Sequence, residues 1–288
     1  MEVRPLAELR AADEARFGGK SAALGELIDA GLPVPPGFAL STAASLDEVA
    51  EHYRGLGEPP VAVRSSAIGE DSAKATFAGM QDTYLWVHGH EAVAEAVRKC
   101  WASLDNPEAV AYRERIGGPP PAMGVTVQTM VDAAVAGVMF TCNPVTGDPS
   151  TVAVNASWGL GLAVVGGEVT PDEYRVSKVT GEVLKRTVGP KEIEYVAGPE
   201  GPVRRDVEDD RRAVACLDDG QLEALLEVAR QVEKHFGCHQ DVEWAIDGAG
   251  ELFMLQSRPV TVTPRRETTA GRSAIDLVMG TFGAGKKA

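Results

Sequence analysis

The chain has 288 residues, of which 44% are hydrophobic and 24% charged, a composition typical of a globular protein with one large domain or two smaller ones. Its net charge of −14 argues against a nucleic-acid or anionic-membrane surface, because both need an excess of lysine and arginine. The start of the chain lacks a signal-peptide pattern, and no apolar run approaches about 18 residues. The four cysteines show no metal-type spacing, so we expect reduced thiols in a cytoplasmic protein.

The first third of the chain mixes helices with short strands. Residues 20–30 predict a helix with Leu24, Leu27 and Ile28 on one face, which ends at Gly31. Helical spacing also covers residues 45–57 and 90–104, while strand-like sequence covers residues 61–64 and, after a turn, the end of residues 76–89.

From Met123 onward the sequence is richer in β structure. Apolar or alternating runs predict strands within residues 123–131, 136–142, 151–157, 175–188, 240–246 and 251–260. A helix with an apolar stripe is predicted over residues 220–237, after a polar loop at residues 204–212. This pattern favours an α+β protein with two lobes, at about residues 1–118 and 119–262, followed by a tail or linker at residues 263–288.

The last two predicted strands carry the most informative polar residues. Asp241 and Glu243 share one face of the first strand, and Gln256 and Arg258 share one face of the second, because side chains alternate along a strand. If the DGAG turn pairs these strands, the four side chains converge. Their oxygens suit Mg²⁺ and the guanidinium suits phosphate. An exposed cross-strand salt bridge is the alternative, against which the apolar neighbours argue.

Two further cations are candidates for anion binding. Arg64 ends a predicted buried strand, where its permanent charge is costly unless an anion meets it. Lys20 stands in a GGK sequence that opens a helix, which is a favourable setting for phosphate, although so short a motif more often holds a solvated lysine. The chain lacks the GxxxxGK[ST], HExxH and GxSxG patterns, which argues against a P-loop, a zinc-protease site and a serine-hydrolase site.

Motifs along most of the chain together resemble one family. In chain order they are GGKSAALGEL, VAVRSSA, TFAGMQDTYL, KCWASL, VTVQTMV, AGVMFTCNPVTG, NASWGLGLAVVGGEVTPDEY, DVEWAI and LQSRPVT, and they span about residues 16–262. This set is similar to the N-terminal ATP-binding domain of the phosphoenolpyruvate synthase and pyruvate phosphate dikinase family. The resemblance implies an ATP-grasp-type fold over residues 1–262, in which ATP lies between two α+β lobes.

The resemblance also implies roles for individual residues. Lys20, Arg64 and Arg258 would act as catalytic cations on the triphosphate, and Glu243 and Gln256 would hold Mg²⁺. The remaining expected ATP-binding residues are Asp241, in the metal and phosphate group, and Gln128, Met130 and Val131, along the strand that lines the adenine.

In this family the domain transfers the β,γ-phosphates of ATP to a histidine on a separate swivelling domain and releases AMP. None of the five histidines here lies in the family's Gly-rich Ser-His motif, and the family's acceptor-binding barrel domain is also missing from the sequence. We therefore expect a phosphotransfer subunit, or a domain detached from a larger enzyme, that uses ATP and Mg²⁺. Its expected partner is a separate protein with the phosphohistidine domain and the acceptor-binding domain.

Departures from the family pattern favour an alternative, a catalytically reduced regulatory module that binds nucleotide. Glu108 stands where relatives commonly carry an arginine, although Arg113 or Arg115 could substitute. Leu162 replaces an acid in a GLGE motif, and the stretch between GFAL and VAVRSS is shorter than expected. The presence of the complete expected set of phosphate- and metal-binding residues argues against this alternative; the set is Lys20, Arg64, Glu243, Gln256 and Arg258. A third reading, a self-contained small-molecule kinase, lacks any sequence feature that would supply an acceptor site.

Overall fold

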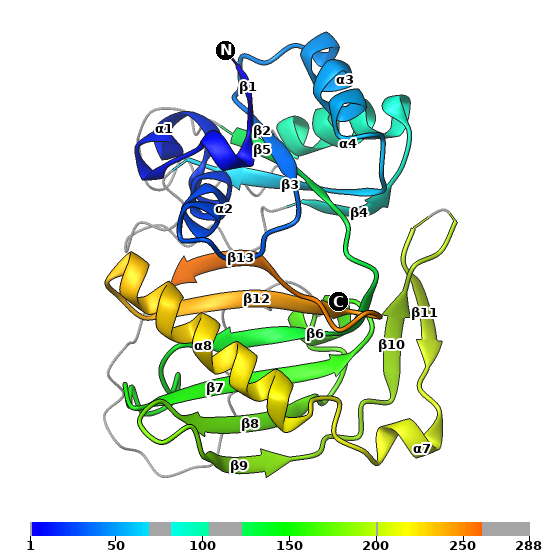
Figure 1. The fold of residues 1–288 in the computed structure, drawn as a ribbon. Coiled ribbons are helices and arrows are strands. Elements are labelled where there is room, and N and C mark those ends of the chain that lie inside the picture. The colour runs from blue at the N-terminus through cyan, green and yellow to red at the C-terminus, as the bar shows by residue number, and fades with distance from the viewer. Residues whose placement is uncertain (1, 69–81, 104–122, 200, 261–288) are drawn as a thin grey trace, which may run out of the picture. The chain divides into compact units, whose positions relative to one another are not determined.

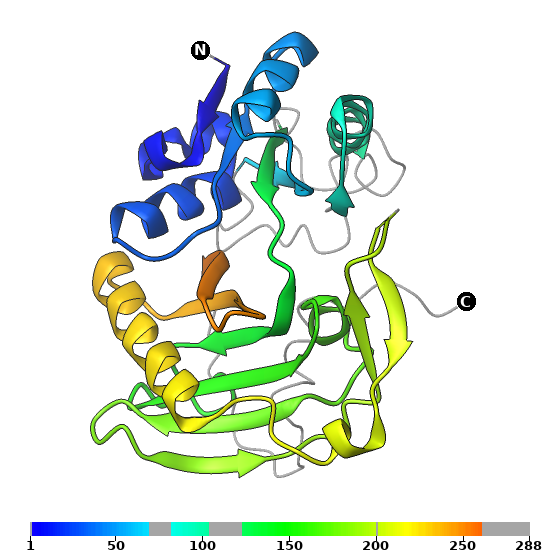
Figure 2. The same cartoon turned by 45° about the vertical axis from the view of Figure 1, so that its right-hand side comes forward.

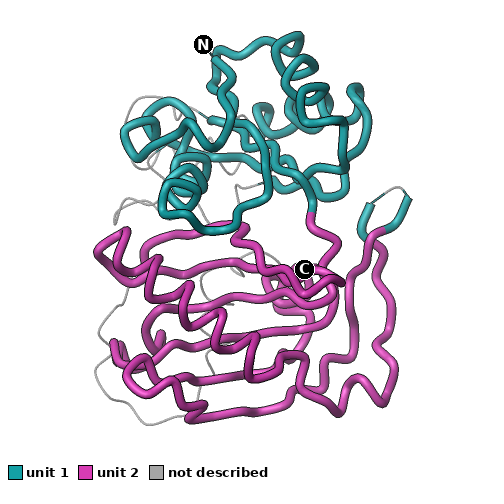
Figure 3. The backbone as a smooth tube through the Cα atoms, viewed as in Figure 1, with its two compact units in different colours: residues 1–130, 198–202 teal, residues 131–197, 203–288 magenta. Residues whose placement is uncertain are grey.

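The computed structural model describes residues 2–68, 82–103, 123–199 and 201–260. The chain divides into two compact units (Figure 3): unit 1 comprises Met1–Met130 and Gly198–Pro202, and unit 2 comprises Val131–Ala197 and Val203–Ala288. The predicted tail at residues 263–288 lies outside the described residues. None of the helices in the described ranges could span a bilayer.

Unit 1 is built on a five-stranded antiparallel sheet with the strand order β1-β2-β5-β3-β4 (Figure 1). Its strands are β1 (Val3–Pro5), β2 (Gly37–Leu40), β3 (Val61–Ala67), β4 (Thr83–Val87) and β5 (Met123–Thr129). Its helices are the 3-10 turns η1 (Leu6–Glu8) and η2 (Ala11–Asp13), and α1 (Glu14–Phe17), α2 (Gly19–Asp29), α3 (Leu46–Gly55) and α4 (His90–Ala102). Side chains of α3 and α4 join those of the sheet in one buried apolar cluster, which fixes both helices on a single face.

The division between the units differs from the predicted lobe boundary at residues 118 and 119. The strand β5 pairs with both β2 and β3 and is the central strand of the unit 1 sheet. Unit 1 therefore continues to Met130. The predicted boundary lies just before Met123, where the sequence becomes richer in strand-like runs. Such a run does not indicate which earlier strands it will pair with.

Unit 2 is built on a six-stranded antiparallel sheet with the order β13-β12-β6-β7-β8-β9, and a two-stranded ribbon, β10-β11, accompanies it. The strands are β6 (Ala133–Phe140), β7 (Thr151–Trp158), β8 (Asp172–Ser177), β9 (Val183–Thr187), β10 (Ile193–Val196), β11 (Val203–Asp206), β12 (Gln240–Asp247) and β13 (Leu252–Pro259). The helices are α6 (Leu162–Val165), α7 (Asp209–Arg212) and α8 (Asp219–Phe236). The long helix α8 lies across one face of the six-stranded sheet, and the short helix α6 lies on the opposite face (Figures 1 and 2).

Helix α8 confirms the predicted helix over residues 220–237. Asp218 caps it, because its carboxylate accepts a 2.8 Å bond from the Gln221 N–H while the Gln221 side chain accepts from the Asp218 N–H at 3.0 Å. Gly237, in the left-handed conformation, ends it. The predicted apolar stripe is buried from Leu222 to Val232, so the helical spacing identified the face that packs on the sheet.

The polar stretch at residues 204–212 was predicted as a loop, but it forms part of β11 and all of α7. Its charged side chains have specific partners. Arg205 and Arg211 both donate to the buried carboxylate of Glu194, at 2.8 Å, and the Arg211 guanidinium lies 4.7 Å from the centre of the Trp158 ring. Charged contacts therefore hold β11 and α7 in place. A helix or strand is predicted from a pattern of apolar residues, which this stretch lacks, so the sequence did not reveal these two elements.

Candidate nucleotide-binding site

The pairing of β12 with β13 brings the predicted polar residues of unit 2 together. In the antiparallel register Asp241 lies opposite Arg258, and Glu243 lies opposite Gln256. The connecting turn is held by the side chain of Asp247, whose Oδ1 accepts two backbone N–H bonds at 2.9 Å. Since directly opposed residues project from the same face of a sheet, the four side chains converge as the sequence predicted.

Asp241 and Arg258 form an ion pair at this hairpin. The Nε and Nη2 atoms of Arg258 donate to Oδ2 of Asp241 at 3.0 and 2.8 Å. Burial raises the pKa of Asp241 to about 6, although the arginine acts in the opposite direction, and the carboxylate of Glu243 raises the pKa further. The site therefore holds two neighbouring carboxylates of which one is poorly hydrated.

The donor set fits a divalent cation. Oδ1 of Asp241 is buried and has no hydrogen-bond partner among the described residues. A buried carboxylate oxygen in that state is costly unless a cation or a donor meets it. The carboxylate of Glu243 and the amide oxygen of Gln256 add the hard oxygen ligands that Mg²⁺ prefers. On these grounds the residues present suit Mg²⁺.

An apolar surface continues from this group across the sheet. Phe140 lies opposite Asp241 and Val138 lies opposite Glu243, on the neighbouring strand β6. The next residue of β12, Trp244, is fully buried and projects from the other face. The polar group thus lies at one edge of a largely apolar sheet face rather than on an open polar surface.

In unit 1 the start of α2 is fastened to the sheet, which fixes the position of Lys20. A Cβ atom on Gly18 would lie 2.1 Å from the Ser66 carbonyl oxygen, so the backbones approach closely there. The N–H of Ser21 donates to Ser66 Oγ at 3.3 Å, and Ser21 Oγ lies 2.7 Å from Thr126 Oγ1. The predicted helix with a GGK start is therefore present and docked on β3 and β5.

Arg64 and Gln128 share the sheet face on which α2 packs. Arg64 lies opposite Thr126, and Gln128 is two residues further along β5. Gln128 is 2% exposed, and its Nε2 has no hydrogen-bond partner among the residues that the structure describes. A buried amide donor of this kind is available to a ligand acceptor.

The predicted site residues fall into two groups. Unit 1 carries Lys20, Arg64, Gln128 and Met130, and unit 2 carries Val131, Asp241, Glu243, Gln256 and Arg258. Met130 and Val131 are the adjoining residues at the division of the units, and the Met130 N–H donates to the Pro60 carbonyl at 2.9 Å. Glu108, Arg113 and Arg115, on which the alternative reading partly rested, lie outside the described residues.

Sequence reasoning missed one buried polar group of unit 2. Asp172 and Lys191 form an ion pair in which both side chains are 0% exposed. The partners of Asp172 include backbone N–H groups from distant segments, and no sequence pattern marks such a set. The only available signal was the acidic pair Asp172 and Glu173 at the end of the glycine-rich segment.

Comparison with known proteins places the chain in a family. The model for "Pyruvate phosphate dikinase, AMP/ATP-binding domain" matches residues 45–277. A probable phosphoenolpyruvate synthase of Methanothermobacter thermautotrophicus is 39% identical over 331 residues, covering 95% of this chain and 48% of that protein. The phosphoenolpyruvate synthase of Pyrococcus furiosus is 40% identical over 249 residues, covering 83% of this chain and 30% of that protein. The chain thus spans half or less of the length of these relatives.

A solved structure agrees with the fold. The dinucleotide-forming acetyl-coenzyme A synthetase 1 of Ca. Korarchaeum cryptofilum, in complex with coenzyme A, Ca-AMPCP and HgCl+, matches with a TM-score of 0.50 and 14% identity, covering 84% of this chain and 91% of that one. The predicted α+β fold of ATP-grasp type is confirmed. From the extent of the family match and the identity to its relatives, the chain belongs to the pyruvate phosphate dikinase AMP/ATP-binding domain family.

Proposed function

We propose that this chain binds Mg-ATP and transfers its β,γ-phosphates to a histidine of a swivelling domain that these 288 residues do not include, with release of AMP. The observation that carries the proposal is the register of β12 and β13, which sets Asp241 beside Arg258 and Glu243 opposite Gln256. Membership of an AMP/ATP-binding domain family supports the choice of nucleotide. The relatives named phosphoenolpyruvate synthases support the choice of reaction.

Each polar residue has a defined task in this proposal. Arg258 binds phosphate oxygens, and Asp241 orients its guanidinium through two bonds to one carboxylate oxygen. Glu243 and Gln256 would hold Mg²⁺, which would offset the negative charge of the phosphate oxygens. Lys20 at the start of α2 supplies a further cation.

The transfer step exchanges one phosphorus–oxygen bond for one phosphorus–nitrogen bond. A neutral histidine nitrogen attacks the β-phosphorus, and the bond between that phosphorus and the oxygen that bridges to the α-phosphate breaks. AMP leaves with this oxygen and its negative charge. Lys20 and Arg64 stabilise the charge that develops on the phosphates during the step.

The adenine base of ATP is recognised by the end of β5 in unit 1 and by the two residues that follow this strand. Gln128 offers its buried amide group to a ring acceptor, Met130 packs on the adenine, and Val131 contributes backbone groups. This assignment predicts that Gln128→Ala weakens ATP binding more than it weakens tripolyphosphate binding, because tripolyphosphate has no base.

Thermal unfolding with and without Mg-ATP tests the proposal. Ligand at about 100 times its Kd should stabilise the folded chain by about 2.7 kcal/mol. Glu243→Gln should lose most of this shift, whereas Glu223→Gln, the same change on the exposed side of α8, should keep it. An unchanged melting temperature of the folded wild-type chain in millimolar Mg-ATP would refute the proposed function. Binding without phosphate transfer would favour the regulatory alternative.

A further inference from the structure

The glycine-rich segment at residues 159–171 connects β7 with β8 and contains α6. Its apolar side chains, among them Ala163 and Val164, are buried in one cluster with Val138 and Phe140 of β6 and Ile193 of β10. Val138 and Phe140 are the direct cross-strand neighbours of Glu243 and Asp241. The segment therefore packs on the sheet face that carries the candidate site, beside its two carboxylates.

The entry of this segment is fastened to β10. The N–H of Leu160 donates to the Tyr195 carbonyl at 2.8 Å. Gly159 has a φ of +72°, and a Cβ atom there would lie 2.3 Å from the same carbonyl oxygen, so only glycine permits this approach. Further along, the Tyr195 hydroxyl donates to the carboxylate of Glu168, with oxygen–oxygen distances of 3.0 and 3.2 Å.

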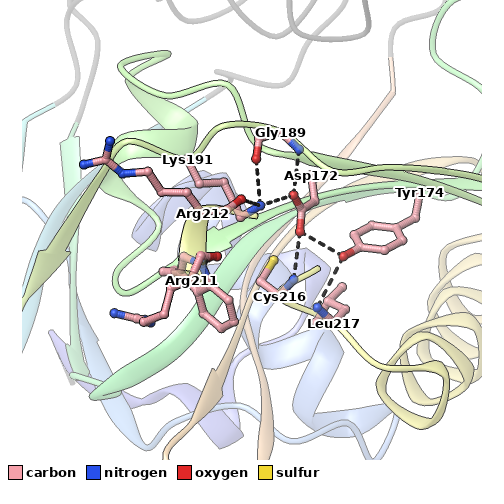
Figure 4. Close-up of polar contacts among 9 residues, drawn as sticks. Asp172, Tyr174, Gly189, Lys191, Arg211, Arg212, Cys216 and Leu217 are labelled. Atoms are coloured by element: carbon pink, nitrogen blue, oxygen red, sulfur yellow. Dashed lines mark hydrogen bonds and ion pairs between the residues drawn. The ribbon is translucent and has the colours of Figure 1, made fainter. Parts of the chain in front are cut away.

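The exit of the segment is fastened by Asp172, the first residue of β8 (Figure 4). Its buried carboxylate accepts bonds from the Gly189 N–H at 2.8 Å, the Cys216 N–H at 2.8 Å and the Tyr174 hydroxyl at 3.1 Å, and from Lys191 Nζ. One side chain thus joins the end of the glycine-rich segment to the turn before β10 and to the residues before α8.

Lys191 also joins the end of the glycine-rich segment to the turn before β10 and to α7. Its Nζ also donates to the carbonyls of Gly189 at 2.8 Å and Arg212 at 3.3 Å, and its N–H donates to the Thr170 carbonyl at 3.3 Å. Its φ of +40° is unusual for a lysine. A Cβ atom on Gly189 would lie 2.3 Å from the Pro171 carbonyl oxygen, so the two backbones touch. Residues 189–195 therefore hold both ends of the glycine-rich segment.

A buried ion pair is weak evidence for stability, because desolvation offsets much of the attraction between the charges. Directional bonds to four backbone groups do, however, fix where a chain segment runs. We propose that Asp172 and Lys191 are positioning residues for the nucleotide site: together with Tyr195 they hold the glycine-rich segment against the site face in the conformation that Mg-ATP binding requires. This inference rests on the proposed function.

Calorimetric titration with Mg-ATP tests the proposal on two variants, each of which changes a buried side chain of unit 2. Lys191→Met removes the cation but keeps the length of the side chain. Leu225→Ala removes a buried side chain of α8, on the opposite face of the sheet, and serves as the control for lost stability. At a temperature where both are folded, Lys191→Met should bind Mg-ATP about 10-fold more weakly than the wild type, and Leu225→Ala should bind within about 2-fold.

A milder pair of variants decides the question if Lys191→Met does not fold. Tyr195→Phe removes only the hydroxyl that holds Glu168, and Lys185→Met removes an exposed ion pair to Glu173 elsewhere on the sheet. Weaker Mg-ATP binding by Tyr195→Phe alone, at unchanged melting temperature, supports positioning. If the two variants of each pair bind Mg-ATP with equal affinity, the positioning role is wrong and the proposed function stands. If the wild-type chain binds no Mg-ATP, both the positioning role and the proposed function are wrong.

Discussion

Arg258 makes both of its bonds to Asp241 through a single oxygen, Oδ2, at 3.0 and 2.8 Å. The other oxygen, Oδ1, is buried without a hydrogen-bond partner among the described residues. This arrangement explains why the pKa of Asp241 rises to about 6 beside an arginine: the cost of desolvating the carboxylate exceeds the attraction of a guanidinium that reaches only one oxygen. The ion pair is therefore incomplete until a further cation or donor arrives.

The pH dependence of stability should reveal this incomplete pair. Because the native pKa of Asp241, about 6, lies above the ordinary 3.8 of aspartate, the contribution of this group to stability is full below about pH 3.8 and is lost as the pH rises through about 6. Asp241→Asn abolishes this titration. The difference in unfolding free energy between variant and wild type should move in favour of the variant by up to about 3 kcal/mol from pH 4 to pH 7.

Urea unfolding across that pH range, with EDTA present, measures the difference. Glu223→Gln is the matched control, since Glu223 is exposed on α8. A difference that stays constant with pH, or that moves in favour of the wild type, would contradict the account of Asp241.

Removing Arg258 tests the same ion pair through its effect on stability. Arg258→Ala leaves a buried carboxylate without its cation and should lower the unfolding free energy by about 2 to 4 kcal/mol while the chain remains folded. The double variant Asp241→Asn/Arg258→Ala should recover most of that loss, because no buried charge remains. Additive losses in a double-mutant cycle would mean that the two residues are not coupled.

The start of α2 provides a test of the unit 1 framework. Gly18 has a φ of +84° and its Cβ position lies 2.1 Å from the Ser66 carbonyl oxygen, whereas Gly31, with a φ of +77°, has open space around it. Gly31→Ala should cost about 1 kcal/mol of stability through backbone strain alone, and Gly18→Ala should cost about 3 kcal/mol because a clash is added. Equal losses in urea unfolding would show that the GGK turn is not held against β3.

Local patterns predicted the two elements to which we assign phosphate and metal binding. The hairpin of β12 and β13 was predictable because alternation fixes the face of each strand and the DGAG turn fixes the register between neighbours in sequence. The start of α2 was predictable for a similar reason, since its glycines and its apolar face are all local. The roles of Lys20 and Gln256 were suggested by the local pattern and by the family resemblance, and they remain proposals.

Contacts between distant segments were not predictable. Asp172 and Lys191 are 19 residues apart, and half of the carboxylate's donors are backbone N–H groups, which every sequence offers. Glu194 likewise receives its arginines from a stretch that looks like a polar loop. The pairing of β5 with β2 and β3 depended on the whole sheet, so the lobe boundary was placed too early.

Transfer of a labelled phosphate tests the central claim most directly. The chain would be incubated with Mg²⁺, β-³²P-labelled ATP and a separately produced protein that carries a Gly-rich Ser-His motif. We expect acid-labile label on the histidine of that protein, release of AMP in equal amount, and loss of both with Lys20→Ala, Arg64→Ala or Arg258→Ala. Release of ADP at a normal enzymatic rate, with γ-phosphate alone transferred to a small acceptor, would contradict the account.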